Sequence, residues 1–108
     1  MSELASIVVE RQTEHVTISL RGEIDASNAG HVRSELEDAI AEPTLVIDLT
    51  RLDYLDSAGI RALFAVAECA ASRRCRCRIV VRSDSPVRRI LDVAGVSSAF
   101  AIAESVAS

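Results

Sequence analysis

The stretch TLVIDLTRLDYLDSAGIRAL, residues 44–63, changes its hydrophobic period midway. In its first part Leu45, Ile47 and Leu49 are two apart, which is typical of a β-strand with one buried face. After Asp56 the apolar residues recur at the spacing of a helix. A strand that leads into a helix is the repeating unit of α/β folds, so this stretch indicates the fold class.

The same two periods organise the rest of the chain. The predicted strands are SIVVE (6–10), HVTISLRG (15–22), TLVIDLT (44–50), CRCRIVVR (75–82) and AFAIA (99–103), and the helices between them begin near residues 31, 57 and 86. Ser27 or Asn28 would cap the first helix. The last helix has Ser85 as its cap, Pro86 at its first position and Gly95 after its end.

The resulting order, β-β-α-β-α-β-α-β, predicts an α/β fold in two layers. We expect a mixed four- to five-stranded sheet, because the first two strands form a hairpin and the later ones follow helical crossovers. In the clearest strands apolar residues alternate with polar ones and do not form continuous apolar runs. This pattern predicts that most helices lie on one face of the sheet and that the other face is largely exposed to solvent. Three connections, 22–27, 50–57 and 82–86, meet at one rim of the predicted sheet. In open sheets of this kind, functional sites tend to lie at that rim.

Length and composition limit the class of protein. From a length of 108 residues we expect a single domain, spanning 1–108. A net charge of −4 argues against nucleic acid as a partner. No apolar run is long enough to span a membrane, and residues 1–12 lack the features of a secretory signal. An odd count of three cysteines fits a reducing compartment, so we expect a cytoplasmic protein.

Ser57 has three possible roles: helix cap, catalytic nucleophile, or substrate of another enzyme. A nucleophile elbow requires G-x-S-x-G, whose first position is Leu55 here, and neither His15 nor His31 has an obvious route to Ser57 as a base. We therefore expect no enzymatic activity. Asp56 and Ser57 are both residue types that cap helices well. Gly59 is unusual in the first turn of a helix, and its lack of a side chain would permit close approach by another molecule.

The three acidic residues near the rim and two of the cysteines each have a functional and a purely structural interpretation. Glu23, Asp25 and Asp56 lie on the rim connections and would form an acid–base pair or cation site, or be solvated loop acids. The pair Cys75 and Cys77 shares its face with apolar residues, which favours buried thiols over a metal site.

The basic residues of the predicted strand CRCRIVVR also leave two readings open. Arg76, Arg78 and Arg82 indicate either a solvated strand face or a surface for an acidic partner. The sequence contains neither G-x-G-x-x-G nor any lysine for a P-loop, so we expect no cofactor and no metal.

The segments GEID (22–25) and LVIDLTRLDYLDSAGIRAL (45–63), with the strand–helix order, resemble the STAS domain family. They are most similar to its stand-alone bacterial members, the anti-sigma-factor antagonists. The resemblance implies that Ser57 is phosphorylated by an anti-sigma factor serine kinase. It also implies that the unphosphorylated chain binds this kinase and releases the sigma factor, and that a PP2C-type phosphatase reverses the modification.

The resemblance also implies a partner-binding surface around Ser57, made of Glu23, Asp25, Asp56, Ala58, Gly59 and Ile60. Ala58 departs from the pattern, because many members have a second Ser or Thr there. Topology places Asp25 on the same rim as Ser57. The alternative function is that of a STAS subunit in a larger scaffold or membrane transporter complex, without modification of Ser57.

Overall fold

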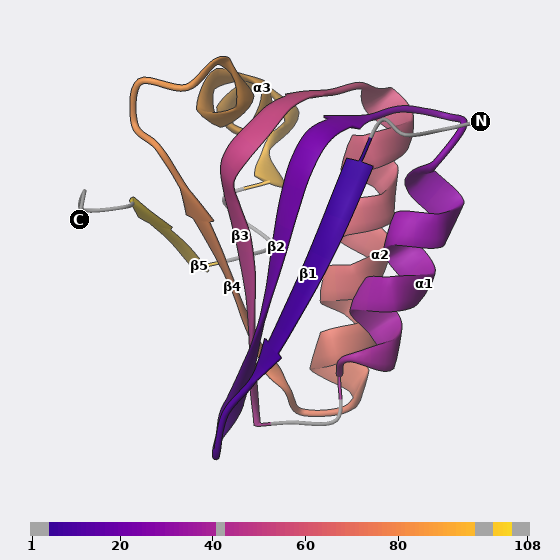
Figure 1. The fold of residues 1–108 in the computed structure, drawn as a ribbon, viewed down its shortest axis with the longest axis vertical. Coiled ribbons are helices and arrows are strands. Elements are labelled where there is room, and N and C mark those ends of the chain that lie inside the picture. The colour runs from indigo at the N-terminus through magenta and orange to yellow at the C-terminus, as the bar shows by residue number, and fades with distance from the viewer. Residues whose placement is uncertain (1–4, 41–42, 97–100, 105–108) are drawn as a thin grey trace.

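The computed structural model describes residues 5–40, 43–96 and 101–104 (Figure 1). Its elements are β1 Ala5–Arg11, β2 His15–Ile24, α1 Ala29–Asp38, β3 Thr44–Leu55, α2 Ser57–Ser72, β4 Arg76–Val81, α3 Pro86–Ala94 and β5 Ala101–Glu104. The described strands form one five-stranded sheet in the order β1-β2-β3-β4-β5. β1 is antiparallel to β2, and each later pair of neighbours is parallel. The predicted element order and the mixed sheet are confirmed.

The helices form the second layer. α1 and α2 lie together along one face of the sheet, and α3 lies apart from them, near the end of β4 (Figure 1). α3 packs against β3 and buries Val87 and Leu91 in the core. Among the described residues, no helix is long and apolar enough to cross a membrane.

Strand register aligns the inward-facing residues into rows. Ile18, Ile47 and Ile79 are partners across β2, β3 and β4, and all three are completely buried. Cys75, directly before β4, is buried, and Cys77 lies on the same face of β4 as Ile79 and Val81, as predicted. Burial, with a smaller effect of the neighbouring Cys75, raises the pKa of the Cys77 thiol to about 12, so this thiol is protonated at neutral pH.

The central strands are longer than the sequence predicted. The segments 22–27 and 50–57 were expected to be connections, but β2 continues to Ile24 and β3 continues to Leu55, where the two residues are paired. Two register shifts give β3 extra residues relative to β2, which bends the pair. Gly22 sits at one shift with φ of +92°, a conformation that favours glycine.

The ends of α3 are as predicted, whereas the start of α1 is not. The Ser85 hydroxyl accepts a hydrogen bond from the Val87 N–H at 3.0 Å, and Gly95 is left-handed with φ of +79°. Asn28 occupies the cap position of α1, but its side chain makes no capping hydrogen bond. In the predicted last strand, residues 99 and 100 lie outside the described residues.

Candidate functional site

The start of α2 separates the roles of Asp56 and Ser57. Asp56 is the N-cap, and its Oδ1 accepts hydrogen bonds from the N–H groups of Ala58 at 2.8 Å and Gly59 at 3.1 Å. Ser57 is the first helical residue and is exposed. Its hydroxyl has no hydrogen-bond partner among the described residues. The capping role therefore belongs to Asp56, and the Ser57 hydroxyl faces solvent.

Gly59 is required by the fold itself. It is buried, and a Cβ built on it would lie 3.1 Å from Ile24 Cγ2 and 3.1 Å from Leu55 Cβ. The absence of a side chain thus lets the first turn of α2 pack tightly on the ends of β2 and β3. Close approach by another molecule was the reason inferred from the sequence. In the structure, the space beside Gly59 is instead occupied by Ile24 and Leu55 at the ends of β2 and β3.

Asp25 lies in a tight turn after β2. Its Oδ1 accepts hydrogen bonds from the Ser27 hydroxyl at 2.6 Å and from the Ser27 N–H at 2.9 Å. These two hydrogen bonds, the hydroxyl's first, hold the pKa of Asp25 below its ordinary value. Asp25 is therefore a carboxylate at neutral pH, fixed in orientation by Ser27.

Asn28 is a structural residue of the site that sequence reasoning treated only as a cap. It is buried, its Oδ1 accepts the Asp25 N–H at 2.9 Å, and its Nδ2 donates to the Glu23 carbonyl at 2.9 Å. The side chain thus closes the loop between β2 and α1 and satisfies its own polar groups. The only sequence signal was its position after GEID, which does not reveal these two hydrogen bonds.

Strand pairing brings the two acidic segments together. The Asp56 N–H donates to the Ile24 carbonyl at 3.0 Å, immediately before Asp25 in the chain. Asp25 therefore lies on the same rim as Asp56 and Ser57, as topology predicted. Glu23 is exposed on β2 beside Tyr54, its partner in register. No group of three or more acidic, His or Cys side chains suited to a metal ion occurs in the described part of the chain.

Tyr54 is a second residue that sequence reasoning missed. Its side chain is 47% exposed, three residues before Ser57. An exposed tyrosine at a site is a frequent anchor of protein–protein contacts, because it offers apolar area with a polar tip. No pattern in the sequence pointed to Tyr54, since the segment around it was expected to be an irregular loop.

A small groove adjoins Ser57 between the N-terminal halves of α1 and α2. It measures about 290 Å³ and is lined by Ala29, Gly30, Arg33, Ala58, Arg61 and Ala62. Ala58 thus lines an open groove at the surface of the protein. Ile60 is half-buried and packs against the core.

The two histidines do not form a catalytic pair with Ser57. His15 begins β2 and is paired with Thr44 at the start of β3, whereas Ser57 follows the end of β3. His31 is exposed on α1, and no hydrogen bond joins it to Ser57 in the residues described.

Comparison with known proteins shows the family to which the chain belongs. Residues 6–108 match the STAS domain family. The anti-sigma-B factor antagonist of Listeria monocytogenes is 42% identical over 55 residues, which cover 49% of this chain and 48% of that protein. The match thus spans about half the length of this curated relative.

Solved structures share the fold over nearly the whole chain. A crystal structure of an anti-sigma factor antagonist from Mycobacterium paratuberculosis has a TM-score of 0.82 and 26% identity, covering 94% of this chain and 87% of that one. The structure of unphosphorylated SpoIIAA has a TM-score of 0.77 and 23% identity, and the match covers 94% of this chain and 90% of that one. The structure of phosphorylated SpoIIAA from Bacillus has a TM-score of 0.70 and 22% identity, and the match covers 94% of this chain and 93% of that one. With a family match over almost its full length and the same architecture, this chain belongs to the STAS domain family.

Proposed function

We propose that this protein is an anti-sigma-factor antagonist that is switched off by phosphorylation of Ser57. The observation that carries the proposal is the exposed Ser57 hydroxyl at the start of α2, which makes no hydrogen bond with the described residues, while Asp56 caps the helix. A kinase can therefore reach this oxygen without first breaking an internal hydrogen bond. The names of the relatives support the same class of function.

The local electrostatics suit a reversible switch. A phosphoserine adds about −1.5 to −2 charges, and the N-terminus of a helix stabilises negative charge. The fold of α2 therefore tolerates the modification. A carboxylate of a partner within about 6 Å would experience roughly 1–3 kcal/mol of repulsion at an effective dielectric of about 40–80. Binding thus weakens by about one to two decades with little change in structure.

The partner surface surrounds Ser57. It comprises Glu23, Asp25, Asp56, Ala58, Gly59 and Ile60, to which we add Tyr54. Gly59 contributes through the tight packing that fixes the helix start, because it is itself buried. The partner is an anti-sigma factor serine kinase, a PP2C-type phosphatase reverses the modification, and the protein itself catalyses no reaction.

Phosphopeptide mapping of the protein isolated from its own cells tests the proposal. We expect the phosphate on the peptide that contains Ser57, and we expect a small ATP-binding kinase to co-purify. Ser57→Ala should abolish phosphorylation by that kinase, whereas Ser34→Ala, at an exposed serine of α1, should not. Co-purification with a membrane or ring-shaped assembly, with Ser57 unmodified, would instead support the scaffold or transporter function.

A further inference from the structure

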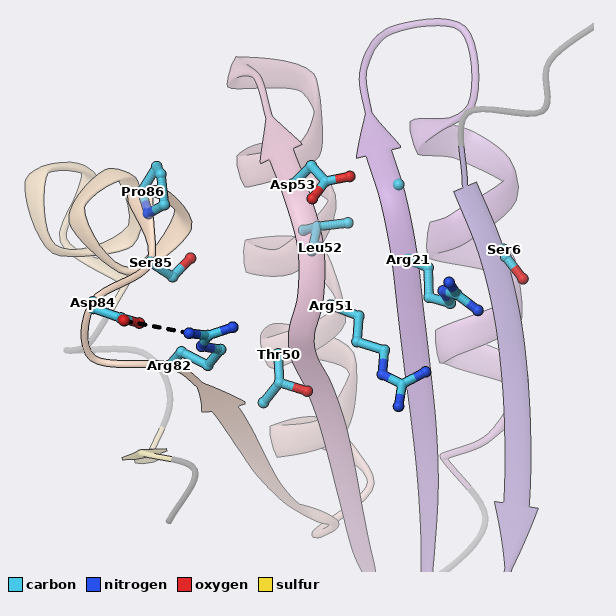
Figure 2. A pocket seen from close by; sticks show the side chains of 11 residues that line it. Ser6, Arg21, Thr50, Arg51, Leu52, Asp53, Arg82, Asp84, Ser85 and Pro86 are labelled. Carbon is cyan, nitrogen blue, oxygen red and sulfur yellow. Dashed lines mark hydrogen bonds and ion pairs between the residues drawn. The ribbon is translucent and has the colours of Figure 1, made fainter. Parts of the chain in front are cut away.

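The open face of the sheet carries a second site, separate from Ser57. A groove of about 790 Å³ crosses β2 and β3 on the face away from α1 and α2 (Figure 2). Its lining comes from β1, β2, β3 and the segment that joins β4 to α3. Neither Ser57 nor any residue of α2 lines it. An inference about this groove is therefore independent of the proposed function.

Two arginines lie on neighbouring strands in this groove. Arg21 of β2 and Arg51 of β3 are direct partners in the sheet register, and both are exposed. Neither side chain has an ion pair or hydrogen-bond partner among the described residues. Like charges directly opposite each other on neighbouring strands are destabilising. No carboxylate of the described residues forms an ion pair with either arginine, and Asp48, which lines a smaller adjoining groove with both, does not bridge them.

The irregularity of β3 creates this arrangement. Leu49 and Leu52 are both buried, so the two residues between them, Thr50 and Arg51, both leave the core. In a regular strand only one of two consecutive residues would face outward. The register shift thus places Arg51 opposite Arg21 and re-aims its side chain, as bulges do near functional sites. Figure 2 shows Arg51 extending from β3 across β2.

A third arginine completes the basic lining. Arg82 follows β4 and pairs with Asp84 at 3.3 Å, with both side chains well exposed. Exposed pairs of this kind are weak, so Arg82 can turn to another anion. Asp53 lies farther along β3, past the arginines (Figure 2). The lining holds three arginines and two aspartates, so its formal charge is +1 in a chain whose net charge is −4.

We propose that Arg21, Arg51 and Arg82 bind the phosphoryl group of a small phosphorylated molecule. Guanidinium groups pair with phosphate oxygens in a bidentate geometry, and an anion between Arg21 and Arg51 replaces their repulsion with attraction. The residues that line the groove include no aromatic side chain on which a nucleobase would stack. Recognition therefore rests on the phosphoryl group.

Calorimetric titration of the full chain tests this site. Inorganic phosphate and glycerol phosphate should each bind saturably. Arg21→Gln and Arg51→Gln should each weaken binding about tenfold, because each removes a charge-assisted contact. Arg78→Gln is the matched control, since Arg78 is an exposed arginine of β4 outside the groove, and it should bind as the wild type does. A phosphoserine peptide that binds more tightly than both small ligands would assign the groove to a phosphorylated protein and overturn the small-molecule assignment.

Thermal unfolding gives a second readout. In buffer free of phosphate, Arg51→Gln should raise the melting temperature, because it removes the like-charge pair. Added phosphate should raise the melting temperature of the wild type and of Arg78→Gln equally, and should raise that of Arg51→Gln less at the same concentration. Equal binding of phosphate by the wild type and the groove variants, or no saturable binding, would overturn the proposal.

Discussion

The backbone N–H of Asp56 donates a hydrogen bond to the carbonyl of Ile24 at 3.0 Å, which joins two segments thirty-two positions apart. This contact continues the pairing of β2 with β3 up to the rim of the sheet. It fixes the turn that holds Asp25 next to the start of α2. The candidate phosphorylation site is thus assembled by strand register, with Ser57 on a helix and Asp25 on a turn.

Replacing Ser57 by Ala should leave stability unchanged to within about 0.5 kcal/mol, because its exposed hydroxyl makes no hydrogen bond within the described structure. Asp56→Ala should instead lower the free energy of unfolding by about 0.5–2 kcal/mol, because it removes the cap of α2. Urea denaturation of both variants measures the difference. Equal losses would show that Ser57 shares the capping role.

Ser57→Asp should weaken binding to the kinase. A single added charge about 6 Å from a carboxylate of the partner costs roughly 0.7–1.4 kcal/mol, which lowers affinity about threefold to tenfold. Ser57→Asn is the control, since it has nearly the same shape without the charge. Calorimetric titration against the purified kinase measures both, and identical affinities for the two variants would contradict an electrostatic switch.

Asp25→Asn should leave the melting temperature nearly unchanged and alter the rate at which the kinase phosphorylates Ser57. The amide oxygen of Asn can still accept the hydrogen bonds from Ser27, so the turn is kept and only the charge is removed. A time course with purified kinase and ATP gives the rate. A wild-type rate would remove Asp25 from the partner surface and leave it a purely structural role in the turn.

Gly59→Ala should destabilise the protein by about 1–3 kcal/mol, although Ala favours helices, because the new methyl group would press on Ile24 and Leu55 in the core. Gly30→Ala is the matched control. It lies in the first turn of α1 with nothing within 4 Å of the added Cβ, so stability should hold or rise by up to about 1 kcal/mol. Thermal unfolding compares the two, and equal effects would rule out the close packing of Gly59.

Ser27→Ala should raise the pKa of Asp25 toward its ordinary value of 3.8. Because the pKa of Asp25 is lower in the folded protein than in the unfolded chain, its contribution to stability is present above pH 3.8 and is lost as pH falls through the folded value. The variant should therefore lose less stability upon acidification in that range. NMR titration of the Asp25 carboxyl measures the shift, with Ser34→Ala as a control that should not change it.

The sequence by itself determined the element order and the buried face of each central strand. Buried apolar residues alternate with more polar ones at Val16, Ile18 and Leu20, and again at Leu45, Ile47 and Leu49. This alternation depends only on residues that are adjacent in the chain, so it is visible in the sequence. The ends of α3 were predictable for the same reason, because Ser85 and Gly95 act within a single turn. The placement of Asp25 near Ser57 also followed, since parallel strands end at one rim.

Only the tertiary structure decided the features that depend on pairing between distant segments. β3 extends to Leu55 because β2 offers hydrogen-bond partners there, although residues 51–55 lack a regular alternation. Asp56 caps α2 and Ser57 is its exposed first residue, and this assignment depends on the residue at which the backbone turns from β3 into the helix. The space beside Gly59 and the opposition of Arg21 to Arg51 both arise from register, which a one-dimensional pattern does not contain.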